Sequence, residues 1–378
     1  MLRVAGRGIP PARRALATDV SRLFSPLTLR GTTFRNRAWV SPMCQYSSVD
    51  GRPSDWHLVH LGSFARGGAG LVVQEATAVT AEGRISPHDA GLWDDAQAGD
   101  YRRINDFVAG QGAVPGIQLA HAGRKASSKR PWDGRGFVAP DDGGWTPVGP
   151  TDEAYPGLAS PAALSTEQVR ELVGAWRAAA VRADAAGFGV IEIHAAHGYL
   201  LHEFLSPLTN TRTDAYGQDR ARLLTEVVDA VREVWPERKP LFVRLTGSDW
   251  APGGLTVDDA VAVAKGLDGH GVDLYDISSG GLVSEQEITA GPGYQVPFAR
   301  AVREQAGVPT AAVGLITAPE QAEQIVLDGS ADAVMLARAV LREPSWPQRA
   351  AFELAHDETE APDALYWAPQ YERAKPAR

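Results

Sequence analysis

Two histidines and a tyrosine stand within six residues of each other, at His194, His197 and Tyr199. They follow the apolar run 189–193, so they come where a buried strand is expected to end. Imidazole donates hydrogen bonds to an oxygen that gains negative charge, and phenol delivers a proton. Together the three side chains can polarise a carbonyl group and protonate a neighbouring carbon. The motif therefore predicts chemistry on an activated double bond.

The elements that must position these residues are eight short apolar runs, each followed by a helix-like stretch. The runs span 38–43, 70–74, 116–120, 190–194, 241–246, 273–278, 310–314 and 333–337. Most are continuously apolar, as expected of strands buried on both faces of a parallel sheet. Their alternation with helices predicts an α/β fold, a (β/α)₈ TIM barrel. The open, doubly wound alternative is disfavoured because no Gly-x-Gly-x-x-Gly turn follows an early run.

Capping residues support the helices of this pattern. Ser165 and Gln168 predict a capping box that opens a long helix. Thr317 and Glu320 predict a second box, with Pro319 in the first turn of its helix.

The predicted organisation is one barrel domain over residues 21–378. A lid insertion is expected after strand three, at about 126–163, because this Pro- and Gly-rich stretch holds Trp132 and Trp145; a plain surface loop is the alternative. A C-terminal tail is expected at about 360–378. Residues 1–20 are predicted to be a disordered extension or, given four arginines and no acid in the first 18 residues, an organelle-targeting segment.

The composition bounds the class of protein. The chain has 378 residues, of which 44% are hydrophobic and 22% charged, as in a soluble globular protein. A net charge of −9 disfavours nucleic acid as a partner, and the lack of a long apolar run disfavours a membrane span. Cys44 is the only cysteine, which excludes an intrachain disulfide and a cysteine-built metal or iron–sulfur centre. We expect a cytoplasmic protein with a small-molecule substrate.

The carboxyl ends of the eight runs lie on the face where barrel active sites form. They supply amide, thiol, arginine, histidine and tyrosine groups but no ring of carboxylates, so no metal site is predicted. Gly314 and Arg338 fit a phosphate site made of backbone N–H groups and a guanidinium. Gln118 and Arg244 suit the edge of a heteroaromatic ring with several carbonyls. A phosphate joined to such a ring indicates flavin mononucleotide (FMN).

The chain resembles the Old Yellow Enzyme family of FMN-dependent ene-reductases, and within it the thermophilic-like class. The resemblance runs from about residue 23 to residue 373. It is carried by 41–44 (SPMC) with Tyr46, 118–125 (QLAHAGRK), 194–199 (HAAHGY), 204–207 (FLSP), 210–214 (NTRTD) and 370–373 (QYER).

The resemblance implies a role for each matching residue. His194 and His197 would bind the carbonyl oxygen of the substrate, and Tyr199 would protonate its α-carbon after hydride reaches the β-carbon. Cys44 would lie beside the flavin ring and tune its potential. FMN would be held by Ser41, Pro42, Met43, Cys44, Ala76, Gln118, Arg244, Gly314, Ala337 and Arg338.

The same resemblance implies that Tyr46 and Lys125 contact the substrate. Arg373 would reach into the site of a neighbouring subunit, in a homodimer or homotetramer. The predicted function is that of an NADPH dehydrogenase, an ene-reductase that takes hydride from NADPH or NADH. It would reduce enones, enals and maleimides, with nitro compounds as a further class, by a ping-pong mechanism.

Taken alone, these residues have simpler interpretations. The two histidines could be structural or, with Glu192 and Glu203, metal ligands. Cys44 could be a small buried hydrophobic residue, and Lys125 and Arg373 could be solvated charges. On a barrel, a metal-dependent hydrolase or aldolase is the alternative function, disfavoured by the missing carboxylates. A silent flavin carrier is disfavoured because it needs no proton donor.

The sequence departs from the family pattern in two places. The loop 216–220 (YGQDR) is three residues shorter than usual, which predicts a changed entry into the next helix. Ala337 stands where a glycine is usual before Arg338. Its methyl group would crowd the phosphate and weaken FMN retention.

Overall fold

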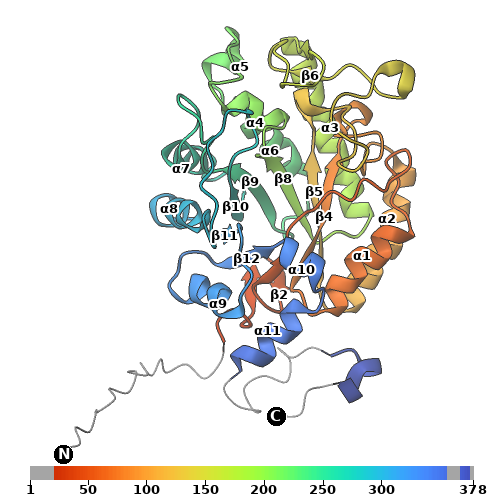
Figure 1. Ribbon diagram of the computed structural model, residues 1–378, viewed down its shortest axis with the longest axis vertical. Coiled ribbons are helices and arrows are strands. Elements are labelled where there is room, and N and C mark those ends of the chain that lie inside the picture. The colour runs from red at the N-terminus through yellow and green to blue at the C-terminus, as the bar shows by residue number, and fades with distance from the viewer. Residues whose placement is uncertain (1–20, 356–366, 375–378) are drawn as a thin grey trace, which may run out of the picture.

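The computed structural model describes residues 21–355 and 367–374. Within these residues, eight parallel strands close into a barrel, and the predicted (β/α)₈ architecture is confirmed (Figure 1). All eight predicted runs supply a barrel strand. In chain order the strands are β3 (Ala38–Val40), β4 (Leu71–Ala78), β5 (Val114–Ala120), β8 (Val190–Ala195), β9 (Leu241–Thr246), β10 (Leu274–Ser278), β11 (Thr310–Ala312) and β12 (Ala333–Leu336). The predicted extension 1–20 and most of the tail lie outside the described residues.

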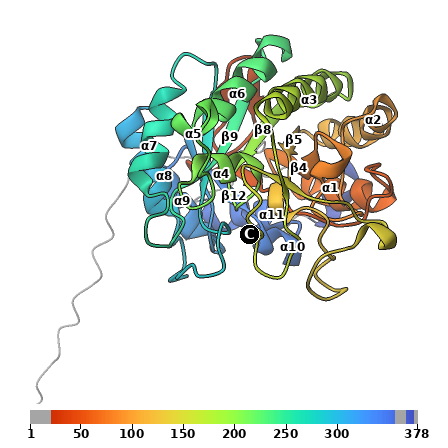
Figure 2. The ribbon, with the colours of Figure 1, turned by 90° about the horizontal axis from the view of Figure 1, so that it is seen from above.

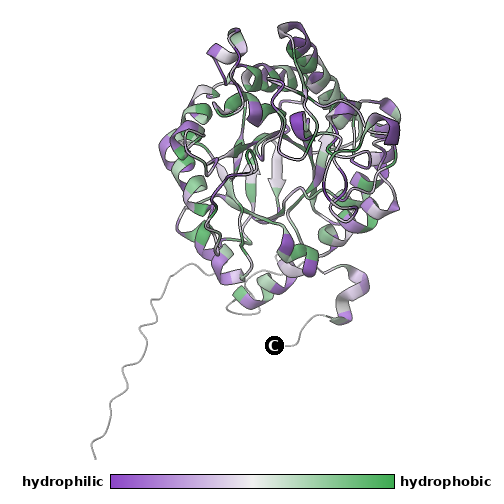
Figure 3. Cartoon of the chain, turned by 45° about the horizontal axis from the view of Figure 1, so that its top comes forward, coloured by the Kyte–Doolittle hydropathy of each residue, from purple (hydrophilic) through white to green (hydrophobic). Residues whose placement is uncertain are grey.

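Helices surround the strands, as the view from above shows (Figure 2). Their ribbons carry both hydrophobic and hydrophilic residues, because one face of each packs on the barrel (Figure 3). None of the described helices has the length and apolar character needed to cross a membrane. The outer helices are α1 (Asp55–Arg66), α2 (Asp95–Gly110), α3 (Thr166–Ala185), α6 (Arg222–Val234), α7 (Val257–Gly266), α8 (Val296–Ala306) and α9 (Pro319–Leu327).

Shorter helices complete the fold: α4 (Leu200–Leu205) and α5 (Ala215–Gln218) precede α6, while α10 (Arg338–Arg342) and α11 (Trp346–Leu354) follow β12. The shortened loop 216–220 therefore includes the end of α5. Asp214 caps that helix by accepting from the Tyr216 N–H, so the loop is anchored despite its length.

The two predicted capping boxes have different outcomes. Ser165 and Gln168 form the expected reciprocal pair at the start of α3. The Thr317 box is wrong, because Ala318 occupies the N-cap of α9 and makes no side-chain capping bond. The Thr317 N–H is instead satisfied by Gln321 Oε1 at 3.1 Å, while Pro319 opens the helix as predicted.

Aromatic residues fill the barrel toward the amino ends of its strands. Phe34 ends a short hairpin of β1 (Leu27–Leu29) and β2 (Thr32–Phe34). Its ring lies 4.7 Å from that of Trp39, which stacks on Phe242 at 5.8 Å. This end of the barrel is packed solid, so chemistry is left to the carboxyl ends.

The segment 126–163 leaves the carboxyl end of β5 and returns to α3. It contains β6 (Val148–Gly149) and β7 (Ala162–Ala163), which pair with each other. The ring of Trp132 meets that of Tyr46 edge-on at 5.8 Å, and the Trp145 indole N–H donates to the Glu82 carbonyl at 2.7 Å. A lid function for this segment stays a prediction.

Candidate active site

The bend after β8 brings the three chemically suited residues together. The ring centre of His194 lies 5.1 Å from that of His197 and 5.2 Å from that of Tyr199, both in edge-on geometry. The bend is tight because His197 adopts a left-handed backbone with φ of +60°.

Burial determines the protonation states of His194, His197 and Tyr199. Burial lowers the pKa of His194 well below its usual range, and the charge on Arg244 lowers it further. The pKa of His197 is lowered for the same two reasons. Burial also raises the pKa of the Tyr199 hydroxyl well above its usual value. At neutral pH the imidazoles are uncharged and the phenol keeps its proton.

Hydrogen bonds orient the two imidazoles. Nδ1 of His194 accepts from the Ala196 N–H at 3.3 Å, so its proton lies on Nε2. Nε2 of His197 lies 2.6 Å from Ser278 Oγ at the end of β10. Gln295 continues this network by accepting from the Ser279 hydroxyl at 2.6 Å.

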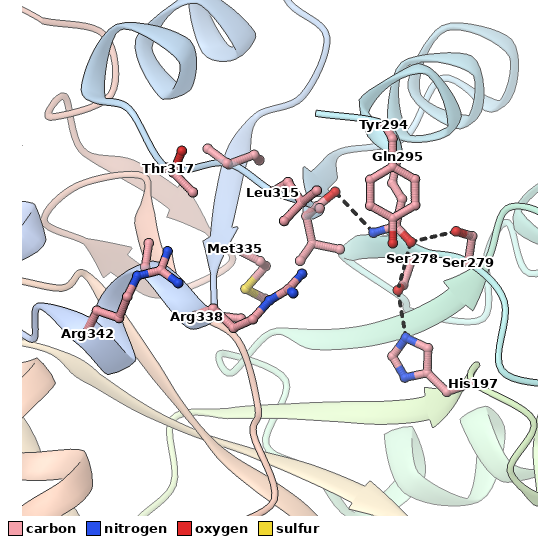
Figure 4. Close-up of a pocket in the computed structure, with 15 residues that line it drawn as sticks. His197, Ser278, Ser279, Tyr294, Gln295, Leu315, Thr317, Met335, Arg338 and Arg342 are labelled. Atoms are coloured by element: carbon pink, nitrogen blue, oxygen red, sulfur yellow. Dashed lines mark hydrogen bonds between the residues drawn. The ribbon is translucent and has the colours of Figure 1, made fainter. Parts of the chain in front are cut away.

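A cavity of about 230 Å³ lies next to His197, where β11 and β12 end (Figure 4). Four predicted site residues line it, namely His197, Gly314, Ala337 and Arg338. Its other lining residues are Ser278, Ser279, Tyr294, Gln295, Val313, Leu315, Ile316, Thr317, Met335, Ala339 and Arg342.

Arg338 and Arg342 stand one helical turn apart on α10 and both line this cavity. Neither guanidinium makes an ion pair or hydrogen bond within residues 21–355 and 367–374. At Gly314, whose φ is +117°, the backbone lies close to the Gln295 side chain, since a Cβ there would lie 2.8 Å from Gln295 Nε2. The cavity thus offers positive charge beside a glycine backbone, which suits an anion.

A polar layer crosses the barrel at the level of these residues. Gln118 Nε2 donates to Glu192 Oε1 at 2.7 Å, and Arg244 Nε lies 3.1 Å from Asp276 Oδ2. Burial raises the pKa of both carboxyl groups. Arg244 is paired in register with His194 on the adjacent strand, so its charge lies close to the histidines.

The other wall of the site is mostly apolar. Cys44, Tyr46 and Tyr199 pack on a cluster of small buried residues that includes Ala76 and Ala120. Burial is the main cause that raises the pKa of the Cys44 thiol, which is therefore protonated at neutral pH.

A bulge in β4 supports this wall, because the register between β4 and β5 shifts between Gln74 and Ala76. The Glu75 carboxylate at this bulge accepts from the Gln45 N–H at 2.7 Å and pairs with His57 at 3.1 Å. The Glu75 carboxylate thus anchors the loop that carries Cys44 through the Gln45 N–H.

The family follows from comparison with known proteins. The chain matches the model of the NADH:flavin oxidoreductase / NADH oxidase family over residues 22–357. It belongs to this family. It is 49% identical over 337 residues to an NADPH dehydrogenase of Geobacillus thermodenitrificans (strain NG80-2), covering 88% of this chain and 94% of that protein.

Solved structures of the family are similar as well. Morphinone reductase in complex with tetrahydroNAD has a TM-score of 0.73 and 28% identity, covering 92% of this chain and 94% of that chain. The old yellow enzyme homologue from Zymomonas mobilis has a TM-score of 0.73 and 25% identity, covering 94% and 99% respectively.

The resemblance to the Old Yellow Enzyme family is therefore confirmed, and the chain is an FMN-dependent NAD(P)H oxidoreductase. This sets aside the metal-dependent hydrolase or aldolase. Among the described residues, no group of three or more His, Cys, Asp or Glu side chains is placed to hold a metal ion. The thermophilic-like class stays a prediction.

The residues present fit FMN. The cavity beside Arg338 suits its phosphate, because it offers positive charge next to the Gly314 backbone. Inside the barrel, Arg244 pairs with Asp276 at 3.1 Å, and Gln118 donates to Glu192 at 2.7 Å. A buried polar layer of this kind suits the polar edge of a bound ring. Of the loop after β3, Ser41 is buried and its N–H donates to the Leu336 carbonyl at 2.9 Å, while Pro42 and Met43 are partly buried.

Lys125 is not a solvated charge, so that simpler interpretation is wrong. Its ammonium donates to the carbonyl oxygens of His197 and Gly281, at 2.6 and 2.8 Å. Burial lowers its pKa to about 8. Arg373 lies exposed on the last turn of the 3₁₀ helix Pro369–Ala374, outside the cavity of its own chain. Its reach into a neighbouring subunit stays a prediction.

Sequence reasoning missed two notable lining residues. Arg342 could have been found, because it follows Arg338 by four residues and shares its helix face. Gln295 carried no local signal, since its contacts lie 16 and 18 residues away along the chain.

Proposed function

We propose that this oxidoreductase reduces the C=C bond of α,β-unsaturated carbonyl compounds. Enones, enals and maleimides are the expected substrates, with nitro compounds as a further class, in a ping-pong reaction driven by NADPH or NADH. The observation that carries the proposal is the grouping of neutral His194 and His197 with protonated Tyr199.

FMN would be held by the strand-end residues. Arg338, Gly314 and Ala337 would hold the phosphate, Gln118 and Arg244 the polar ring edge. Ser41, Pro42, Met43, Cys44 and Ala76 would line the rest of the ring. When bound, FMN supplies the hydride chemistry, accepting hydride from NAD(P)H and passing it to the β-carbon of the substrate.

His194 and His197 would bind the carbonyl oxygen of the substrate, where negative charge develops. Nε2 of His194 carries the proton and can donate, because Nδ1 already accepts from the chain. A donor on each histidine would stabilise the developing oxyanion, each worth about 10²-fold or more in rate. Neutral imidazoles suit this role, since a lowered pKa keeps them in one protonation state across the physiological range.

Tyr199 would protonate the α-carbon. Its raised pKa keeps the proton on the hydroxyl until the carbon becomes basic enough to take it. Tyr46 and Lys125 would contact the substrate, and Cys44 would tune the flavin.

We also propose a cytoplasmic homodimer or homotetramer in which Arg373 enters the neighbouring site. This assignment comes from the sequence resemblance, and size-exclusion chromatography with light scattering tests it. An oligomer whose enone KM is unchanged by Arg373→Ala would contradict the role of that arginine.

The decisive measurement is the visible spectrum of the purified protein under anaerobic conditions. A yellow spectrum that bleaches with NADPH and returns on adding cyclohexenone supports both half-reactions. In Tyr199→Phe, bleaching by NADPH should persist while the return with enone slows by about 10²-fold or more. If flavin reduction itself collapsed in this variant, the proton-donor assignment would be wrong.

A further inference from the structure

The bend that carries the reactive residues contains two consecutive left-handed residues. His197 has φ of +60° and Gly198 has φ of +71°. A Cβ at Gly198 would lie 2.2 Å from the Gly281 carbonyl oxygen, so only glycine fits there. The left-handed conformation of His197 is costly for a residue with a side chain, so surrounding contacts must hold it.

One such contact comes from His202, which lies one turn further along in α4 and is fully buried. Its Nδ1 accepts from the Gly198 N–H at 2.8 Å. Its Nε2 lies 2.8 Å from Asp249 Oδ1. Because Nδ1 accepts, the proton of the neutral ring lies on Nε2 and is donated to the carboxylate. The two hydrogen bonds therefore fix one tautomer and one ring orientation.

Asp249 is fully buried in the loop after β9. Its Oδ2 accepts from the Ser206 hydroxyl at 2.7 Å and from the Leu255 N–H at 2.8 Å. Burial alone would raise its pKa, but the hydrogen bond from His202 and the others bring the pKa below its ordinary value. The carboxylate is thus charged and satisfied, and it ties the bend to two further segments.

We propose that His202 and Asp249 are positioning residues for the reaction, which hold the His197–Gly198 bend so that His197 and Tyr199 face the same substrate. Both side chains are fully buried, and their polar atoms are taken up by the Gly198 N–H, by each other, and by Ser206 and Leu255, so neither is free to touch the reacting atoms. As regards the substrate, this inference rests on the proposed ene-reductase function. Its physical basis is that a displacement of about 1 Å at a catalytic group costs roughly 10²-fold in rate.

The test compares His202→Gln with His202→Leu in FMN-loaded protein. Glutamine can still accept from the Gly198 N–H and donate to Asp249, whereas leucine, of similar size, can do neither. We expect kcat/KM for cyclohexenone to fall about 10²-fold in His202→Leu and to stay within about threefold in His202→Gln. Reduction by NADPH should fall less, because it takes no proton from Tyr199.

A matched control is His270→Leu, which removes another His–carboxylate pair, that with Asp229, on the exposed surface. It should leave both half-reactions unchanged.

A ligand readout is also needed, namely the Kd of oxidised protein for p-hydroxybenzaldehyde, whose phenolate would bind the two site histidines over the flavin and add a long-wavelength absorption band. We expect this Kd to rise about tenfold in His202→Leu and to stay near wild type in His202→Gln.

The outcomes separate the two proposals. Wild-type protein that binds the phenolate but turns over no enone would contradict the proposed function, while the ligand readout would still decide the positioning role. Equal rates and Kd values in His202→Gln and His202→Leu would overturn the inference. If His202→Leu does not accumulate as FMN-bound protein, Asp249→Ala decides, because it removes the acceptor of the His202 Nε2–H, and wild-type values in that variant would overturn the inference.

Discussion

Nζ of Lys125 lies 2.6 Å from the carbonyl oxygen of His197, and the same ammonium sits 4.6 Å from the centre of the Tyr199 ring. The ammonium of Lys125, in the 3₁₀ turn that follows β5, therefore contacts the bend after β8 at both His197 and Tyr199. This contact joins residues 72 positions apart in the chain.

Replacing this cation should disturb the site without unfolding the barrel. Lys125→Met keeps the length of the side chain but removes its hydrogen bonds to two carbonyl groups. We expect kcat/KM for cyclohexenone to fall about tenfold, because a hydrogen bond from a charged group contributes roughly 1.5–3 kcal/mol. Steady-state kinetics measure it, with the exposed Lys129→Met as control. A rate equal to that of the control would show that Lys125 does not position the bend.

The role of Arg338 can be isolated by comparing two flavins. Arg338→Gln removes a guanidinium that we expect to bind phosphate, so the Kd for FMN should rise about 10- to 100-fold. The Kd for riboflavin, which has no phosphate, should not change. Fluorescence titration of the apoprotein measures both. Arg300→Gln, which breaks only a surface pair with Glu304, is the control. A parallel rise for riboflavin would place Arg338 elsewhere on the cofactor.

Ala337 gives a prediction of the opposite sign. Its methyl group lines the cavity beside Arg338 and would crowd the phosphate. Ala337→Gly should therefore leave the Kd for FMN unchanged or lower it, as isothermal titration can measure. A clearly raised Kd would refute the crowding idea.

The buried histidines predict sensitivity to acid. The pKa of His194 is lowered well below 6.5 in the folded protein, whereas in the unfolded chain it stays near that value. Below about pH 6.5 only the unfolded chain takes up this proton, so the folded state loses up to about 1.4 kcal/mol per pH unit. This contribution is complete above that pH and is lost as the pH falls.

In His194→Asn this contribution is absent. Between pH 7 and pH 5 the variant should lose less stability than the wild type, by up to about 2 kcal/mol. Urea unfolding at several pH values, with FMN in fixed excess, measures the difference. Parallel stability curves would mean that His194 is already solvated in the folded protein.

Much of the fold could be predicted because its signals are local. Each apolar run such as 190–194 marks a strand, since burial on both faces of a parallel sheet demands continuous hydrophobicity. The Ser165 capping box marks a helix start for an equally local reason. The proximity of His194, His197 and Tyr199 was also local, because one bend holds them all.

The tertiary structure alone decided how these residues are supported. His202 meets Asp249 across 47 positions, and Gln118 meets Glu192 across 74. Such partners are chosen by barrel closure, which sets strand neighbours and register, and no periodicity in the sequence encodes that choice. By itself, then, the sequence determined the strands, their order and the chemical groups at their ends. Closure of the barrel decided which buried groups pair and which side chains, such as the exposed Arg338, stay open for a ligand, because pairing depends on distances that only the folded chain defines.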